Sequence, residues 1–184
     1  MPVFCHRIFH RIGFRTWGLI PCAIVLLVQL GCGYRLAGSA NNTLAPGQTV
    51  WVGFIANESI SSTAQTVIRR ALLDECHAMR GLLSAGNEAG ADLRISGKLR
   101  SYSNQAISYT AIDQVREYRL TIDVELEIQR KDTGSTLWKG SVAASQDYPA
   151  NNNLALQRSA EEAALAAASR LLAQRFLTAV EQSY

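Results

Sequence analysis

Residues 116–129, with the sequence REYRLTIDVELEIQ, alternate apolar and polar side chains over their whole length. The apolar members of this row are Tyr118, Leu120, Ile122, Val124, Leu126 and Ile128. A period of two places these side chains on one face of a β-strand and the polar ones on the other face. A strand of this kind packs one face against a core and turns the other toward water. The stretch therefore predicts a sheet that is covered on one face only.

Three further segments have strand patterns. Residues 92–109 also alternate, and residues 135–148 follow a turn at 131–134 that predicts a hairpin with residues 116–129. Residues 48–55 form a nearly continuous apolar run. A run without alternation predicts a strand that is buried on both faces.

Two segments have the three- and four-residue apolar spacing of helices. The first begins at Ser61 or Ser62 and runs to about Arg80, where Gly81 suits a helix end. The second, residues 154–180, is rich in strong helix formers. We expect the second helix to bury a stripe made of Leu154, Leu165, Ala168, Leu172, Phe176 and Val180.

The predicted order of elements is β-α-β-β-β-α. The first crossover makes its two strands parallel, and the hairpins make the remaining pairs antiparallel. Two helices on one face of a four-stranded mixed β-sheet would cover every apolar stripe. We therefore expect an α+β fold, a two-layer sandwich formed by a single domain at residues 48–184.

Residues 1–31 have the order of a lipoprotein signal peptide. Three arginines and no acidic residue precede an apolar run at 19–30. A transmembrane helix is the alternative, but the run is shorter than the roughly 20 residues that span a bilayer, and it contains Pro21 and Gln29. Cleavage would leave residues 32–47 as a lipidated tether.

The tripeptide Leu30-Gly31-Cys32 resembles the bacterial lipobox, although Gln29 stands one place before it, where lipoboxes usually have Leu. The resemblance implies that Cys32 carries a covalent diacylglycerol and an acyl chain such as palmitate. Gly33 replaces the Asp that keeps many lipoproteins in the inner membrane, so the outer membrane is implied. Several acyl chains on one residue anchor a protein stably. The alternative is an unmodified Cys after the apolar run.

Composition and residue counts argue against several functions. The chain has 18 Lys+Arg and 15 Asp+Glu, but three arginines lie before Cys32, so residues 32–184 have 15 of each and no net charge. A balanced domain does not indicate nucleic-acid binding. After Cys32 the only histidine is His77. One histidine and one further cysteine supply too few ligands for a zinc site.

Cys76 and His77 are adjacent on the first predicted helix, where neighbouring side chains point about 100° apart and cannot form a catalytic pair. We expect Cys76 to be a small buried apolar residue. We predict no catalytic residue, no metal and no cofactor apart from the lipid on Cys32, so the protein is not expected to be an enzyme.

Asp123, Glu125 and Glu127 form a row on the polar face of the alternating strand. Pairing with Arg94, Lys98 and Arg100 on the neighbouring strand would explain this row without catalysis. The same face could instead meet a polar protein wall.

Three short motifs resemble the LptE family of lipopolysaccharide-assembly lipoproteins. They are Cys32-Gly33-Tyr34-Arg35-Leu36, Asp92-Leu93-Arg94-Ile95 and Glu117-Tyr118. The resemblance implies a non-enzymatic plug inside the LptD outer-membrane β-barrel, which assists barrel assembly and lipopolysaccharide transport from the periplasmic side of the cell outer membrane. The anchor would lie in the inner leaflet of that membrane. A lipoprotein adaptor, or a pilotin for another outer-membrane channel, is the alternative.

Members of this family bind lipopolysaccharide through basic residues, because lipid A phosphates attract Lys and Arg. On this resemblance, the candidates for lipopolysaccharide binding are Lys98, Arg100, Arg116 and Arg119. Charge pairing on a solvated strand face is the alternative role for these four residues.

Replacing Cys32 by Ala should abolish incorporation of labelled fatty acid, because the thiol is the expected attachment point. The measurement is metabolic labelling of the variant beside the wild-type chain. Equal labelling of the two proteins would contradict lipidation at Cys32.

Overall fold

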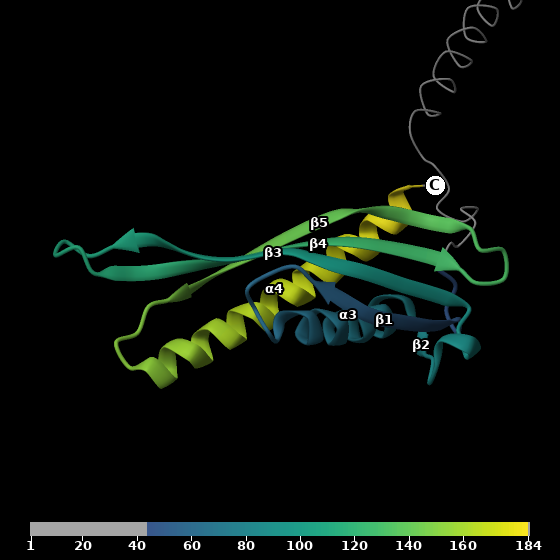
Figure 1. The fold of residues 1–184 in the computed structure, drawn as a ribbon, viewed down its shortest axis with the longest axis horizontal. Coiled ribbons are helices and arrows are strands. Elements are labelled where there is room, and N and C mark those ends of the chain that lie inside the picture. The colour runs from purple at the N-terminus through teal and green to yellow at the C-terminus, as the bar shows by residue number, and fades with distance from the viewer. Residues whose placement is uncertain (1–43, 184) are drawn as a thin grey trace, which may run out of the picture. The chain divides into compact units, whose positions relative to one another are not determined.

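The computed structural model describes residues 44–183. The elements are β1 (Thr49–Asn57), α3 (Ala64–Arg80), β2 (Leu83–Ser84), a 3₁₀ turn (Glu88–Gly90), β3 (Leu93–Tyr109), β4 (Val115–Arg130), β5 (Thr136–Pro149) and α4 (Leu154–Gln182). Both helices lie on the same side of the sheet and share its core (Figure 1). The predicted signal peptide, Cys32 and the motif that follows it lie outside the described residues.

The strands form one mixed sheet in the order β2-β1-β3-β4-β5. β1 is parallel to β2 and β3, and the other pairs are antiparallel. The predicted two-layer α+β sandwich is confirmed, but the sheet has five strands and not four. The additional strand, β2, has only two residues, held by the Ala85 N–H, which donates to the Val50 carbonyl at 2.9 Å. Two residues cannot show an alternating pattern, so the sequence gives no signal for this strand.

β4 is the centre of the core. Its buried side chains are Leu120, Ile122, Val124, Leu126 and Ile128. β3 and β5 flank this strand over nearly its whole length. The predicted division into a core face and an open face is therefore confirmed.

β1 differs from its prediction. Val50, Val52 and Ile55 are buried, but Phe54 is 77% exposed. The register with β3 shifts between Val52 and Ile55, so an irregularity in β1 interrupts the alternation there. The prediction of a strand buried on both faces is wrong, because the helices cover only one face of the sheet.

α3 begins and ends close to the predicted residues. The Ser61 hydroxyl accepts a hydrogen bond from the Ala64 N–H at 3.2 Å, and Gly81 ends the helix in the left-handed conformation at φ 63°. Cys76 is buried in the core, as predicted. Burial raises the pKa of its thiol to about 12, which keeps the sulfur in its unreactive form.

α4 begins after the N-cap Asn153. The Asn153 side chain accepts hydrogen bonds from the N–H groups of Ala155 and Leu156. The predicted stripe is buried from Leu165 onward, but Leu154 is 72% exposed. The buried residues of α4 begin only at Ala164, so the first turns of this helix lack a covering layer.

Gly97 should be intolerant of a side chain. A Cβ atom there would lie 2.6 Å from Leu126 Cδ2 and 2.9 Å from the Glu125 carbonyl oxygen. We expect Gly97→Ala to lower the free energy of unfolding by about 1–3 kcal/mol, as overpacking does. Urea denaturation measures this effect.

Gly86→Ala is the matched control, because no atom lies within 4 Å of a Cβ at Gly86. Its unfolding midpoint should stay near that of the wild type. Equal midpoints for both variants would contradict the close approach of β3 to β4 at Gly97.

Candidate functional site

The sheet face that the helices leave uncovered carries charged side chains from three strands. We call it the open sheet face and define it by Lys98, Arg100, Arg119, Asp123, Glu125, Glu127, Lys139 and Asp147. The strand register brings these residues into cross-strand contact. This surface is the candidate functional site.

Arg100 joins two carboxylates of the open sheet face and the neighbouring loop. Its Nη1 lies 2.8 Å from Glu58 Oε2, and its Nη2 lies 2.5 Å from Glu125 Oε2. Lys98 Nζ also contacts Glu58, at 2.9 Å from Oε1. Hydrogen bonds from Lys98 and Arg100 hold the pKa of the Glu58 carboxyl below its usual value. Two cations thus share the loop carboxylate of Glu58.

Arg119 and Asp147 form a two-pronged pair across β4 and β5. Arg119 Nε lies 2.7 Å from Asp147 Oδ1, and Nη2 lies 2.8 Å from Oδ2. The two residues are direct partners in the strand register. Hydrogen bonding to Arg119 lowers the pKa of Asp147. A planar guanidinium fits a carboxylate in this way, so the pair fixes both side chains.

The remaining carboxylates are also satisfied. Asp123 accepts a hydrogen bond from the Ser141 hydroxyl at 2.5 Å. Glu127 accepts from the Gln129 amide at 2.6 Å and the Thr136 hydroxyl at 3.0 Å. These donors, with Arg100 as the cationic partner of Glu125, account for the row of acids without catalytic chemistry.

Cross-strand pairing of the acidic row with β3 is confirmed at one of the three positions. Arg100 contacts Glu125, but Lys98 turns to Glu58. Arg94 contacts Glu88 at 2.7 Å in the turn before β3. β5 supplies other partners of the row, which the prediction did not include.

The four basic candidates for lipopolysaccharide binding do not converge on one point. Lys98 and Arg100 both contact Glu58. Arg100 precedes Ser101, which pairs with Asp123 of β4, and Arg119 lies four residues from Asp123 along β4. At about 3.4 Å per residue, that separation is about 14 Å.

Arg116 is exposed, and its side chain forms no ion pair with any residue from 44 to 183. Its carbonyl accepts a hydrogen bond from the Ala150 N–H, which fixes the backbone beside the end of β5. Lipopolysaccharide binding by Lys98, Arg100, Arg116 and Arg119 stays a prediction.

A polar cluster on the helix side was not predicted. The Tyr102 hydroxyl donates to Glu161 Oε1 at 2.5 Å, and the Asn104 amide donates to the Tyr148 hydroxyl at 2.5 Å. Tyr118 stacks on Tyr148 with ring centroids 5.6 Å apart. Burial and the bond to Glu161 raise the pKa of Tyr102. The cluster fastens the β3–β4 hairpin to α4 and β5, and its bonded partners lie too far apart in sequence for any local pattern to reveal them.

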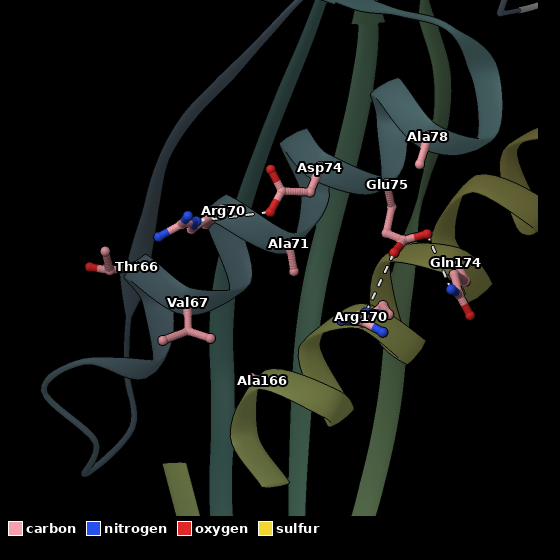
Figure 2. A pocket seen from close by; sticks show the side chains of 10 residues that line it. All are labelled: Thr66, Val67, Arg70, Ala71, Asp74, Glu75, Ala78, Ala166, Arg170 and Gln174. Carbon is pink, nitrogen blue, oxygen red and sulfur yellow. Dashed lines mark hydrogen bonds and ion pairs between the residues drawn. The ribbon is translucent and has the colours of Figure 1, made fainter. Parts of the chain in front are cut away.

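A groove of about 660 Å³ lies between α3 and α4. Its apolar lining includes Ala71, Ala78 and Ala166. Figure 2 shows Glu75 between Arg170 and Gln174, at 3.8 Å and 3.1 Å respectively. The charged side chains of this groove are paired with one another, and the groove has no nucleophile beside a base.

The described part of the chain contains no group of three or more His, Cys, Asp or Glu residues arranged to hold a metal ion. Among the helices of residues 44–183, none is both long and apolar enough to cross a membrane.

Solved structures with the same fold come from several bacteria. Protein XCC0632 of Xanthomonas campestris has a TM-score of 0.53 at 11% identity, covering 76% of this chain and 89% of its own. Protein CT253 of Chlamydia trachomatis has a TM-score of 0.52 at 11% identity, covering 74% and 96%. A candidate lipoprotein of Caulobacter crescentus CB15 has a TM-score of 0.50 at 14% identity, covering 68% and 88%. The class is thus a small two-layer α+β domain shared by these bacterial proteins.

The family is more specific than the fold. The LptE lipopolysaccharide-assembly model matches residues 47–180, and the chain belongs to this family. No curated protein matches the sequence significantly. The family match extends from the residues just before β1 into the last turn of α4, so it covers both layers of the domain and the open sheet face.

The carboxylates of the open sheet face should make stability depend on pH. The pKa values of Glu58 and Asp147 are lowered in the folded chain, so their contribution is present above the unfolded pKa of about 4 and is lost as pH falls. The double variant Glu58→Gln/Asp147→Asn lacks this contribution at every pH. Its loss of stability between about pH 5 and pH 3 should therefore be smaller than that of the wild type.

Urea denaturation across this pH range measures the difference. Glu162→Gln is the control, since Glu162 is an exposed α4 side chain without a bonded partner among residues 44–183. If the double variant and the wild type lose stability in parallel, the carboxylate pairs do not contribute as described.

Proposed function

We propose that this protein is an outer-membrane lipoprotein that plugs the LptD β-barrel, assists its assembly and takes part in lipopolysaccharide transport to the cell surface. The single observation that carries the proposal is the LptE family match over residues 47–180. The geometry of the open sheet face supports it, as follows.

The open sheet face suits a polar protein wall. It carries both signs of charge, and its ion pairs are formed within the domain before any partner arrives. Covering such a face leaves most of its charges in ion pairs and Asp123 hydrogen-bonded to Ser141, which limits the cost of removing these charges from water. The interior of a large outer-membrane barrel is polar, so a self-neutral surface is compatible with it.

The anchor would reach the domain through residues 32–43. Those residues span at most about 40 Å when fully extended. Leu44, in the segment expected as tether, is buried in the core, so the domain itself begins no later than this residue. A lipid on Cys32 would thus hold the domain within that distance of the inner leaflet, on the periplasmic side.

The proposed role is binding and not catalysis. The buried Cys76 thiol is kept protonated, and the neighbouring His77 places its Nδ1 3.1 Å from the Leu82 carbonyl. Lipopolysaccharide would meet the protein through phosphate contacts with Lys98, Arg100, Arg116 or Arg119. Arg116 can do so without breaking an existing ion pair in the described domain.

Affinity purification of the full chain from solubilised outer membranes tests the proposal. We expect a large β-barrel protein of the LptD type to co-purify in equal amount, since a plug is held inside its barrel. Cys32→Ala serves as a comparison, because loss of the anchor should impair membrane attachment without altering the docking surface. Recovery of the chain alone, or with the channel of another secretion system, would contradict the proposal.

A further inference from the structure

Within residues 44–183, three stretches of sheet edge lack a neighbouring strand. They are the outer edge of β5, the part of β1 beyond its short pairing with β2, and the part of β3 beyond its pairing with β1. Unpaired edges present free N–H and C=O groups to any extended chain, so proteins usually block them.

Arginines from the helices block two of these edges. Arg69 Nε donates to the Val52 carbonyl of β1 at 2.9 Å, and its guanidinium also lies over the Trp51 ring at 5.6 Å. Arg175 Nη1 donates to the Ala143 carbonyl of β5 at 2.6 Å. Each of these edges therefore has a cation bonded to an outward carbonyl.

The edge of β3 has no such block. Its pairing with β1 ends at Leu99, whose carbonyl accepts from the Glu58 N–H at 3.0 Å. From Ser101 to Ala106 the ladder to β4 is regular on the inner side, between register shifts at Leu99/Ser101 and Ala106/Ser108. Within residues 44–183, no side chain bonds to the backbone of this six-residue stretch.

The register shows which backbone groups face outward. On β4, Arg116 and Arg130 bond toward β5, through Ala150 and Ser135, so even-numbered residues of β4 face β5 and odd-numbered residues face β3. Ser101, Ser103 and Gln105 are the β3 partners of the odd-numbered residues Asp123, Thr121 and Arg119. The N–H and C=O groups of the alternate residues Tyr102, Asn104 and Ala106 therefore point away from β4.

Charge also distinguishes this edge. Between Arg100 and Arg116 the only charged residue is Asp113, in the turn of the hairpin. Ile107 and Tyr109 are exposed beyond the regular stretch. An uncharged, partly apolar edge complements an uncharged segment, because a charged one would lose water without gaining a partner.

A cavity of about 360 Å³ lies next to the same edge, on the helix side. Tyr102 of β3 lines it, with Ile60 and the polar residues 61–63 before α3, and with Leu165 and the charged side chains of Arg158, Glu161 and Glu162 of α4. Strand addition draws affinity from backbone hydrogen bonds and specificity from pockets that accept alternate side chains. This cavity is placed to accept one side chain of an added strand.

We propose that the outer edge of β3 at residues 101–106 is a strand-addition site for an extended, uncharged segment of the barrel partner. The inference rests on the proposed function for the identity of that partner. Beyond that function, it specifies the surface and the backbone groups that bind the partner and the kind of partner segment that they bind.

Hydrogen exchange on the full chain, alone and in complex with the co-produced barrel, tests the inference. The amides of Tyr102, Asn104 and Ala106 should exchange at least about tenfold more slowly in the complex, because each would donate a new backbone hydrogen bond.

Ala106→Pro removes one outward N–H without removing a donor to β4, and proline is tolerated on strand edges of this kind. We expect it to weaken barrel binding about tenfold. Ser145→Pro is the matched control. Ser145 lies two residues from Ala143, so the Ser145 N–H also faces outward from β5. The Ser145→Pro variant should bind the barrel as tightly as the wild type does. Thermal unfolding of both free variants verifies that they fold.

The outcomes separate the two proposals. If the barrel binds the wild type but exchange at residues 101–106 is unchanged and Ala106→Pro binds equally well, the strand-addition site is wrong and the proposed function stands. If no barrel binds the wild type, the proposed function fails and the inference fails with it. Protection that grows with the concentration of the free chain would assign the edge to a second copy and overturn the choice of partner.

Discussion

The burial of the apolar row on β4 is the interaction on which the rest of the structure depends. Each fully buried aliphatic side chain contributes about 1.5–3 kcal/mol, and β4, an interior strand between β3 and β5, supplies five such residues. Because their period is two, burying them turns the intervening charged residues to the opposite face. The burial that builds the core therefore also creates the open sheet face. A single layer of helices is enough to cover the apolar face of the sheet.

The register shift between Leu99 and Ser101 connects the core to the surfaces that we propose for binding. Leu99 is buried, and after the extra residue Arg100 the alternation resumes one place out of phase, so that Tyr102 reaches Glu161 on the helix side. Arg100 itself remains exposed and bonds Glu58 and Glu125. One extra residue thus turns Tyr102 toward α4 at the point where β1 ends and the outer edge of β3 loses its partner strand.

Local periodicity predicted the elements whose side-chain pattern does not depend on which distant element packs against them. The alternation of β4, the stripe of α3 and the stop at Gly81 are readable because they repeat within a few residues. β2, the exposed Phe54 and the exposed Leu154 were missed because each depends on which surfaces a distant element covers. The blocking arginines Arg69 and Arg175 are likewise invisible in sequence, since nothing local marks a basic helix residue that reaches a strand carbonyl.

The proposed function requires that a barrel wall cover the open sheet face in the outer membrane. Ser141, an exposed β5 residue on this face, offers a direct probe when replaced by Cys. The measurement is the fraction of Ser141→Cys chains modified by a membrane-impermeant thiol reagent in opened outer-membrane vesicles, compared with the purified free chain. Protection in the membrane with full reaction in the free chain is the predicted result, and equal reaction in both would contradict the claim.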